Sequence, residues 1–120
     1  MDEVRRPGDG ELEGFVVADG DGWLALTVFG GVLAWAPTVE AARAIVQERG
    51  LASLAERWHW WSRETREWRI VVPQEAHPGR VRVAVGYYSL PGVETVVITA
   101  VDLAAGDRLV LAPPNAEDDR

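Results

Sequence analysis

Apolar residues near the N-terminus form short runs that are separated by tight turns. The run at 15–18 leads into Asp19-Gly20-Asp21-Gly22, and Asp and Gly both tolerate the positive φ angles of a hairpin turn. The run at 23–29 is apolar at almost every position, which predicts a strand that is covered on both faces. A third run, at 32–36, follows the Gly30-Gly31 pair. The pattern therefore predicts three consecutive antiparallel strands.

The apolar spacing changes to a helical period after Pro37. Thr38 is a typical N-cap residue, and Gly50 stands where a helix C-terminal glycine is expected. The first helical face consists of Val39, Ala42, Ile45 and Val46. A second apolar stripe follows directly, with members three or four positions apart: Leu51, Leu54, Ala55, Trp58 and Trp61. Because the connection is short, we expect two helices that pack as a hairpin against the sheet.

From Glu67 onward the period of the pattern is two. Apolar and polar residues alternate over 67–72 and 80–88, and 93–101 is rich in β-branched residues, which favours a central strand. A last short apolar run lies at 108–112. The sequence therefore predicts an α+β fold, with a mostly antiparallel sheet, a two-helix hairpin packed on it and the order βββ-αα-ββββ.

Charge is concentrated at the two ends of the chain. The net charge is −7, and residues 1–21 hold seven acidic side chains against two Arg. We expect a disordered acidic arm at 1–11, a single domain at 12–114 and a disordered acidic tail at 115–120. No apolar run approaches the roughly 20 residues that span a bilayer, and the N-terminus lacks the apolar core of a signal peptide. We therefore expect a cytoplasmic protein that makes no membrane contact.

Two absences from the composition limit the chemistry. The chain has no cysteine, which excludes disulfides, thiol nucleophiles and thiolate metal sites. All 12 basic side chains are Arg, so a Schiff-base lysine and a lysine-containing phosphate loop are also excluded. No cofactor is predicted.

The remaining candidates for catalysis or metal binding lack a diagnostic spacing. On a helix, His59 and Ser62 would lie on one side, but this spacing is common by chance. His59, Glu75 and His77 form an acceptable set of metal ligands without a recognised motif. We therefore predict neither a catalytic group nor a metal site.

The segment 57–69 combines tryptophan with arginine more densely than the rest of the chain. Trp60 falls outside the expected helical stripe, and an exposed Trp beside Arg is typical of a protein interface and also of a base-stacking surface. Alternatively, the tryptophans are core residues, or are covered by Arg side chains. The predicted partner-binding residues are Arg57, Trp60, Arg63, Arg66 and Arg69. A second candidate surface consists of Arg80, Arg82 and Tyr88. The tryptophans predicted to be buried are Trp23, Trp35, Trp58 and Trp68.

The stretch from Phe15 to Val46 resembles the βββ-α start of HicB-type antitoxins and of the arm-binding domains of some integrases. The similar part is a hairpin, a third strand and then Thr38-Val39-Glu40-Ala41-Ala42. The second half of the chain departs from both families, so the resemblance assigns no functional residue.

The sequence favours a small non-enzymatic protein-binding module, such as an inhibitor, antitoxin, immunity protein or phage-type regulator, whose partner is another protein. One alternative is a small enzyme or ligand carrier with a pocket between sheet and helices. Another is a single-stranded nucleic-acid binder that uses segment 57–69. The overall acidity disfavours that last alternative, because the phosphate backbone attracts basic surfaces.

Overall fold

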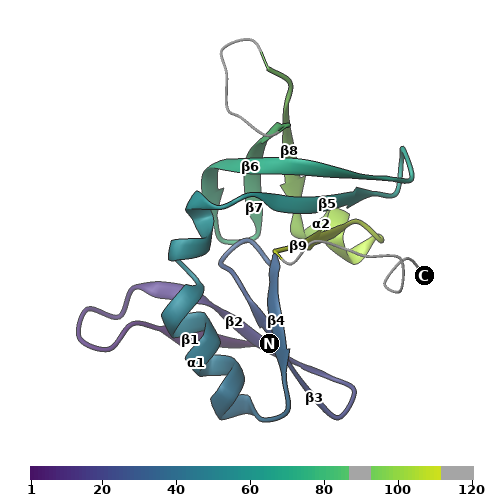
Figure 1. Ribbon diagram of the computed structural model, residues 1–120. Helices are drawn as coiled ribbons and strands as arrows, with labels where there is room; N and C mark the ends of the chain where they lie inside the picture. The colour runs from purple at the N-terminus through teal and green to yellow at the C-terminus, as the bar shows by residue number, and fades with distance from the viewer. Residues whose placement is uncertain (87–92, 112–120) are drawn as a thin grey trace.

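The computed structural model describes residues 1–86 and 93–111. In this part of the chain, nine strands form one mixed sheet in the spatial order β1-β2-β3-β4-β9-β5-β6-β7-β8 (Figure 1). In chain order the elements are β1 (Asp2–Arg5), β2 (Leu12–Asp19), β3 (Gly22–Leu26), β4 (Val32–Ala36), α1 (Val39–Arg49), a 3₁₀ turn η1 (Ala52–Ala55), β5 (Trp58–Ser62), β6 (Glu67–His77), β7 (Arg80–Val85), β8 (Thr95–Thr99), α2 (Ala100–Ala104) and β9 (Arg108–Val110).

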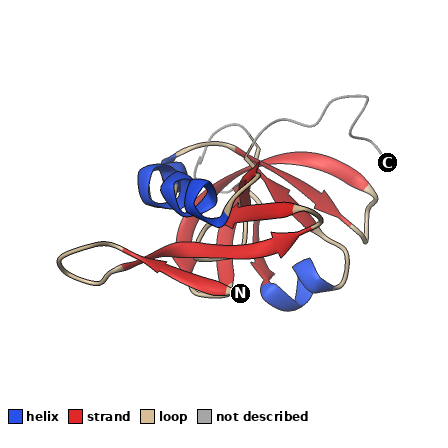
Figure 2. Ribbon diagram, turned by 90° about the horizontal axis from the view of Figure 1, so that it is seen from below, coloured by secondary structure: helices blue, strands red, loops and turns tan. Residues whose placement is uncertain are grey.

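The N-terminal half is an antiparallel meander with α1 packed on one face (Figure 2). Thr38 caps α1 as predicted, since its hydroxyl accepts a hydrogen bond of 3.1 Å from the backbone N–H of Ala41. The helix buries Ala42 and Val46 against the sheet. A Cβ added at Gly14 would lie 2.8 Å from the Val46 side chain, so the strand needs glycine where the helix crosses it.

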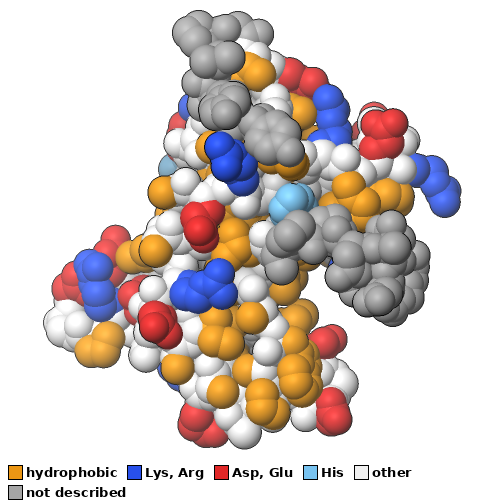
Figure 3. All heavy atoms as spheres, viewed as in Figure 1, with side chains coloured by type: hydrophobic (Ala, Val, Ile, Leu, Met, Phe, Trp, Pro, Cys, Tyr) orange, Lys and Arg blue, Asp and Glu red, His pale blue; other side chains and the backbone are white. Residues whose placement is uncertain are grey.

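The opposite face of this meander is apolar and partly exposed. Val17, Leu24 and Trp35 lie side by side across β2, β3 and β4 on the face that α1 does not cover. Trp35 is 48% exposed, so the prediction that it is buried is wrong. Figure 3 shows further apolar side chains grouped where Figure 1 draws α1, β3 and β4.

The first eleven residues were expected to form a disordered arm, with structure beginning near Leu12. Instead, the structure places β1 antiparallel to β2 and buries Val4 completely. The loop that joins the two strands projects from the body in both views (Figures 1 and 2). Arg6 pairs with Asp9 and Glu11 across this loop. The predicted tail at 115–120 lies outside the described residues.

The predicted two-helix hairpin and the order βββ-αα-ββββ are wrong. After α1 the chain makes only the short turn η1 and enters β5, which pairs antiparallel with β6. Trp58, Trp60 and Ser62 are buried, whereas His59 and Trp61 are half-buried, so burial alternates as it does in a strand. Gly50 ends α1 with a right-handed φ of −55°, and glycine is required there because a Cβ would lie 2.5 Å from the Glu13 carbonyl oxygen.

The C-terminal half bends sharply. β6 carries an irregularity between Pro73 and Glu75, and β5 and β6 cross β7 and β8 at a large angle (Figure 1). β9 returns to pair antiparallel with β5 and parallel with β4. The two halves also share one core, in which the ring of Phe29 packs edge-on against Trp58 at 5.3 Å.

Candidate functional site

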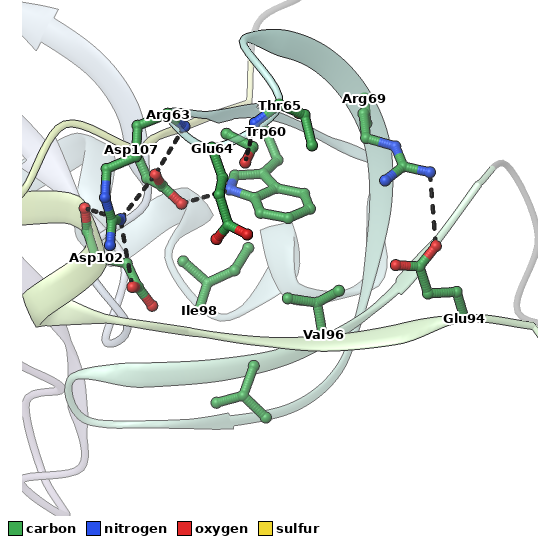
Figure 4. Close-up of a pocket in the computed structure, with 12 residues that line it drawn as sticks. Trp60, Arg63, Glu64, Thr65, Arg69, Glu94, Val96, Ile98, Asp102 and Asp107 are labelled. Carbon is green, nitrogen blue, oxygen red and sulfur yellow. Dashed lines mark hydrogen bonds and ion pairs between the residues drawn. The ribbon is translucent and has the colours of Figure 1, made fainter.

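A hollow of about 300 Å³ lies between the β5–β6 hairpin and β8. Trp60, Val96 and Ile98 form its apolar floor and point toward one another (Figure 4). Arg63, Glu64 and Arg69 stand on the hairpin side of its rim. The hollow therefore combines a largely buried apolar floor, in which Trp60 is 7% and Ile98 1% exposed, with a charged border.

Asp107 holds together the end of the hollow nearest α2. Its carboxylate accepts a hydrogen bond of 3.0 Å from the indole N–H of Trp60. It also accepts hydrogen bonds from the backbone N–H and the guanidinium of Arg63, at 3.0 and 2.9 Å. The Asp107 side chain is only 6% exposed, so this charge is desolvated and firmly paired. The hydrogen bond to Asp107 raises the pKa of Arg63 above its ordinary value.

Asp102 extends this network to α2. Its carboxylate accepts a hydrogen bond of 2.9 Å from the backbone N–H of Thr99, and the Thr99 hydroxyl accepts one from the Asp102 N–H, forming a capping box. The bond from the Thr99 N–H is the largest effect lowering the pKa of Asp102, and the Thr99 hydroxyl and Arg63 add to it. The Asp102 carboxylate also lies 3.4 Å from the Arg63 guanidinium, and this ion pair links the short helix to the hairpin.

The other end of the hollow is more open. Arg69 lies 3.6 Å from the Glu94 carboxylate, in an exposed ion pair. Within the described residues, Glu64 makes no ion pair or hydrogen bond through its side chain. The lining holds four carboxylates against two guanidinium groups, so it is net acidic.

The opposite face of the hairpin is aromatic. The rings of Trp61 and Trp68 lie 5.8 Å apart, directly opposite each other in the β5–β6 register. The Arg108 guanidinium stacks over Trp68 at 5.3 Å from the ring centroid. The interpretation that Arg side chains cover some of these tryptophans is therefore correct for Trp68.

The residues predicted to bind a partner do not form one cluster. Trp60 is 7% exposed, so the prediction of an exposed Trp60 anchor is wrong. Trp60, Arg63 and Arg69 meet at the hollow, but Arg57 precedes the far end of β5. Arg66 lies in the hairpin turn with a φ of 59°. Sequence reasoning missed Glu94, Asp102 and Asp107, which are distant along the chain and carry no motif.

The second predicted surface lies at a smaller hollow of about 190 Å³, which is lined by residues of β6 and β7 and by Val97 of β8. Arg82 pairs with Glu75 at 2.6 Å, and His77 Nε2 lies 2.9 Å from the same carboxylate. The contact with His77, followed by the charge of Arg82, lowers the pKa of Glu75. Arg80 lines the same hollow, while Tyr88 lies outside the described residues.

The candidates for catalysis are not brought together. His59 and Ser62 are three positions apart on a strand, so their side chains face opposite sides. Burial lowers the pKa of His59. Over residues 1–86 and 93–111, no three His, Asp or Glu side chains are grouped as a metal site would need.

No protein family model, curated protein or solved structure matches this chain. None of the helices in the described part of the chain has the length and hydrophobicity needed to cross a membrane.

Proposed function

We propose that this chain is a small non-enzymatic protein-binding module, of the kind that serves as an inhibitor, antitoxin, immunity protein or regulator. The partner contacts the hollow between the β5–β6 hairpin and β8. The observation that carries the proposal is the arrangement around Trp60, where an apolar floor is bordered by charged groups from three separate segments of the chain.

The hydrogen bonds and ion pairs at the hollow support the proposal because they fix the shape of the hollow before a partner binds. Asp107 holds Trp60 and Arg63 in place, and the capping box on α2 holds Asp102. A site whose side chains are already ordered loses little conformational entropy when a partner binds.

The charge of the hollow favours a protein over a nucleic acid. A nucleic-acid groove neutralises phosphates with Lys or Arg, but here both arginines are already paired with carboxylates. Among the residues that the structure describes, the rim charge without an ion pair is that of Glu64, which is negative and would repel phosphate.

Affinity capture from the organism that encodes the chain tests this proposal. The bait is the full chain as wild type, as Glu64→Arg at the rim of the hollow, and as Glu48→Arg on the exposed surface of α1 as a matched charge control. We expect wild type and Glu48→Arg to retain the same protein, and Glu64→Arg to retain at least about tenfold less, a difference of about 1.4 kcal/mol. Equal capture by all three would place the partner elsewhere, and capture of nucleic acid alone would reject the proposal.

A further inference from the structure

In the part of the chain that the structure describes, β1 and β8 end the sheet, and their open edges differ in how they are protected. β1 carries three charged residues out of four, which is a common way to prevent an edge strand from pairing with another chain. β8, at the other end, reads Thr-Val-Val-Ile-Thr and has no charge, proline or bulge. An uncharged, β-branched edge is well suited to accept a further strand.

The register of β7 and β8 shows which backbone groups are available. Val85 donates a hydrogen bond to the Glu94 carbonyl and Ala100 donates one to the Gly79 carbonyl. Because hydrogen-bonded pairs alternate along an antiparallel ladder, the backbone groups of Val96 and Ile98 also face β7. The N–H and C=O groups of Thr95 and Val97 therefore point to the open edge. The N–H of Thr99 also points there, but it is bound by Asp102.

This open edge borders the hollow. Three consecutive residues of β8 line it, Val96, Val97 and Ile98. Alternate side chains of a strand face opposite sides, so Val96 and Ile98 contribute to the floor, while the Val97 side chain lies on the other face of β8, beside Arg82 in the second hollow. Val97 is 51% exposed. An added strand would thus lie against β8 with every second side chain over the apolar floor beside Trp60.

We propose that β8 binds an extended, basic segment of a partner protein as an added strand. This inference rests on the proposed function and specifies how the partner binds. Backbone hydrogen bonds to Thr95 and Val97 hold the segment. Its inward side chains are apolar, and a basic side chain pairs with Glu64.

The acidic charge of the hollow favours a basic partner segment over a second copy of the chain as the strand added to β8. Pairing β8 with itself would bring two acidic hollows together, each with four carboxylates against two arginines. Like charges across an interface oppose association, whereas a basic segment gains from the same field.

A display library of random peptides about ten residues long, selected on the full chain, tests the proposal. We expect the selected peptides to be enriched in Arg or Lys and to alternate apolar with polar positions. Single N-methylation along the best peptide should then weaken binding at every second position, because only alternate N–H groups face β8. If N-methylation leaves binding unchanged at every position, the proposal of an added strand is overturned. This test needs no variant of the protein.

Two substitutions in β8 complement the peptide scan. Val97→Pro removes the outward N–H, which is not part of the β7 ladder, and should weaken peptide binding by about tenfold. Val97→Thr keeps the N–H and should stay within about twofold of wild type. Circular dichroism shows whether each variant is folded, and if Val97→Pro is not, the N-methyl scan decides.

The outcomes separate this inference from the proposed function. If peptides bind Val97→Pro as well as wild type but fail to bind Glu64→Arg, the hollow is a binding site and strand addition is wrong. If Glu64→Arg also binds them normally, the proposed function fails as well. A dimer in light scattering that Val97→Pro abolishes would show that β8 pairs with a second copy, which overturns the inference.

Discussion

Trp60 and Trp35 have the same side chain in opposite surroundings. Trp60 is 7% exposed, and its indole N–H reaches a buried carboxylate oxygen of Asp107. Trp35 is 48% exposed, and its N–H donates at 3.3 Å to the Asp19 carbonyl oxygen on the surface. Loss of the first hydrogen bond would leave a desolvated charge with fewer partners, whereas water can replace the second.

Trp60→Phe should therefore lower the free energy of unfolding by about 1–3 kcal/mol. The matched variant Trp35→Phe should change it by about 0.5 kcal/mol or less, because its surroundings are exposed. Urea unfolding followed by circular dichroism measures both. Equal losses in the two variants would show that the Asp107 bond contributes nothing to stability.

At the residue scale, sequence reasoning predicted the Thr38 cap and the burial of Trp58 correctly. It assigned Trp60 to the wrong environment because it placed Trp60 on a helix. It placed Trp35 correctly on a strand but predicted the wrong burial, because this side chain lies on the face that α1 does not cover. The acidic partners of Arg63 could not be predicted either, since Asp102 and Asp107 reach it only through the path of α2 and β9.

At the scale of elements, the segment after α1 shows why periodicity alone was insufficient. Apolar residues from 51 to 61 fit a helical spacing, yet Trp58, Trp60 and Ser62 fit an alternating one equally well. Tryptophan packs readily on a strand, and pairing of Trp61 with Trp68 across the hairpin favours the sheet. Strands were predicted at 67–72 and 80–88 because their alternation has no helical competitor, and the structure places β6 at Glu67–His77 and β7 at Arg80–Val85. The short helix α2 was missed, and its residues were assigned to the preceding strand and the following turn.

The cap of α2 predicts a dependence of stability on pH. The pKa of Asp102 is lower in the folded chain than its ordinary value of 3.8. Ionised Asp102 therefore stabilises the fold at pH values above 3.8. The contribution should be lost as the pH falls through the folded pKa. Asp102→Asn removes the charge, so the stability difference between wild type and variant should shrink between about pH 6 and about pH 3. A difference that stays constant over this range in urea unfolding would contradict the assigned role.

At the scale of the whole molecule, two halves of the sheet meet at a small junction. Val32 pairs with Val110, and the N–H of Leu111 donates to the Val32 carbonyl oxygen at 3.0 Å. The N–H of Gly79 donates to the Val28 carbonyl at 3.2 Å. With the packed rings of Phe29 and Trp58, these contacts favour unfolding of the two halves as a single cooperative unit.

A substitution at Gly31 tests whether this junction couples the unfolding of the two halves. A Cβ there would lie 2.7 Å from the Phe29 ring and 2.8 Å from the Trp58 ring, both of which are buried. Gly31→Ala should therefore lower the free energy of unfolding by about 1–3 kcal/mol, through displacement of these rings. Amide NMR signals of β2 and β7 should be lost at the same urea concentration. Separate midpoints for the two strands would show that the halves unfold independently.

The central claim is that a partner's chain lies against the hollow beside β8. Amide hydrogen exchange of the full chain, measured with and without the best selected peptide, tests it most directly. We predict slower exchange at Thr95 and Val97, whose N–H groups face the open edge, and unchanged exchange across α1. Protection confined to α1 or to β2–β4, with β8 unaffected, would contradict the claim.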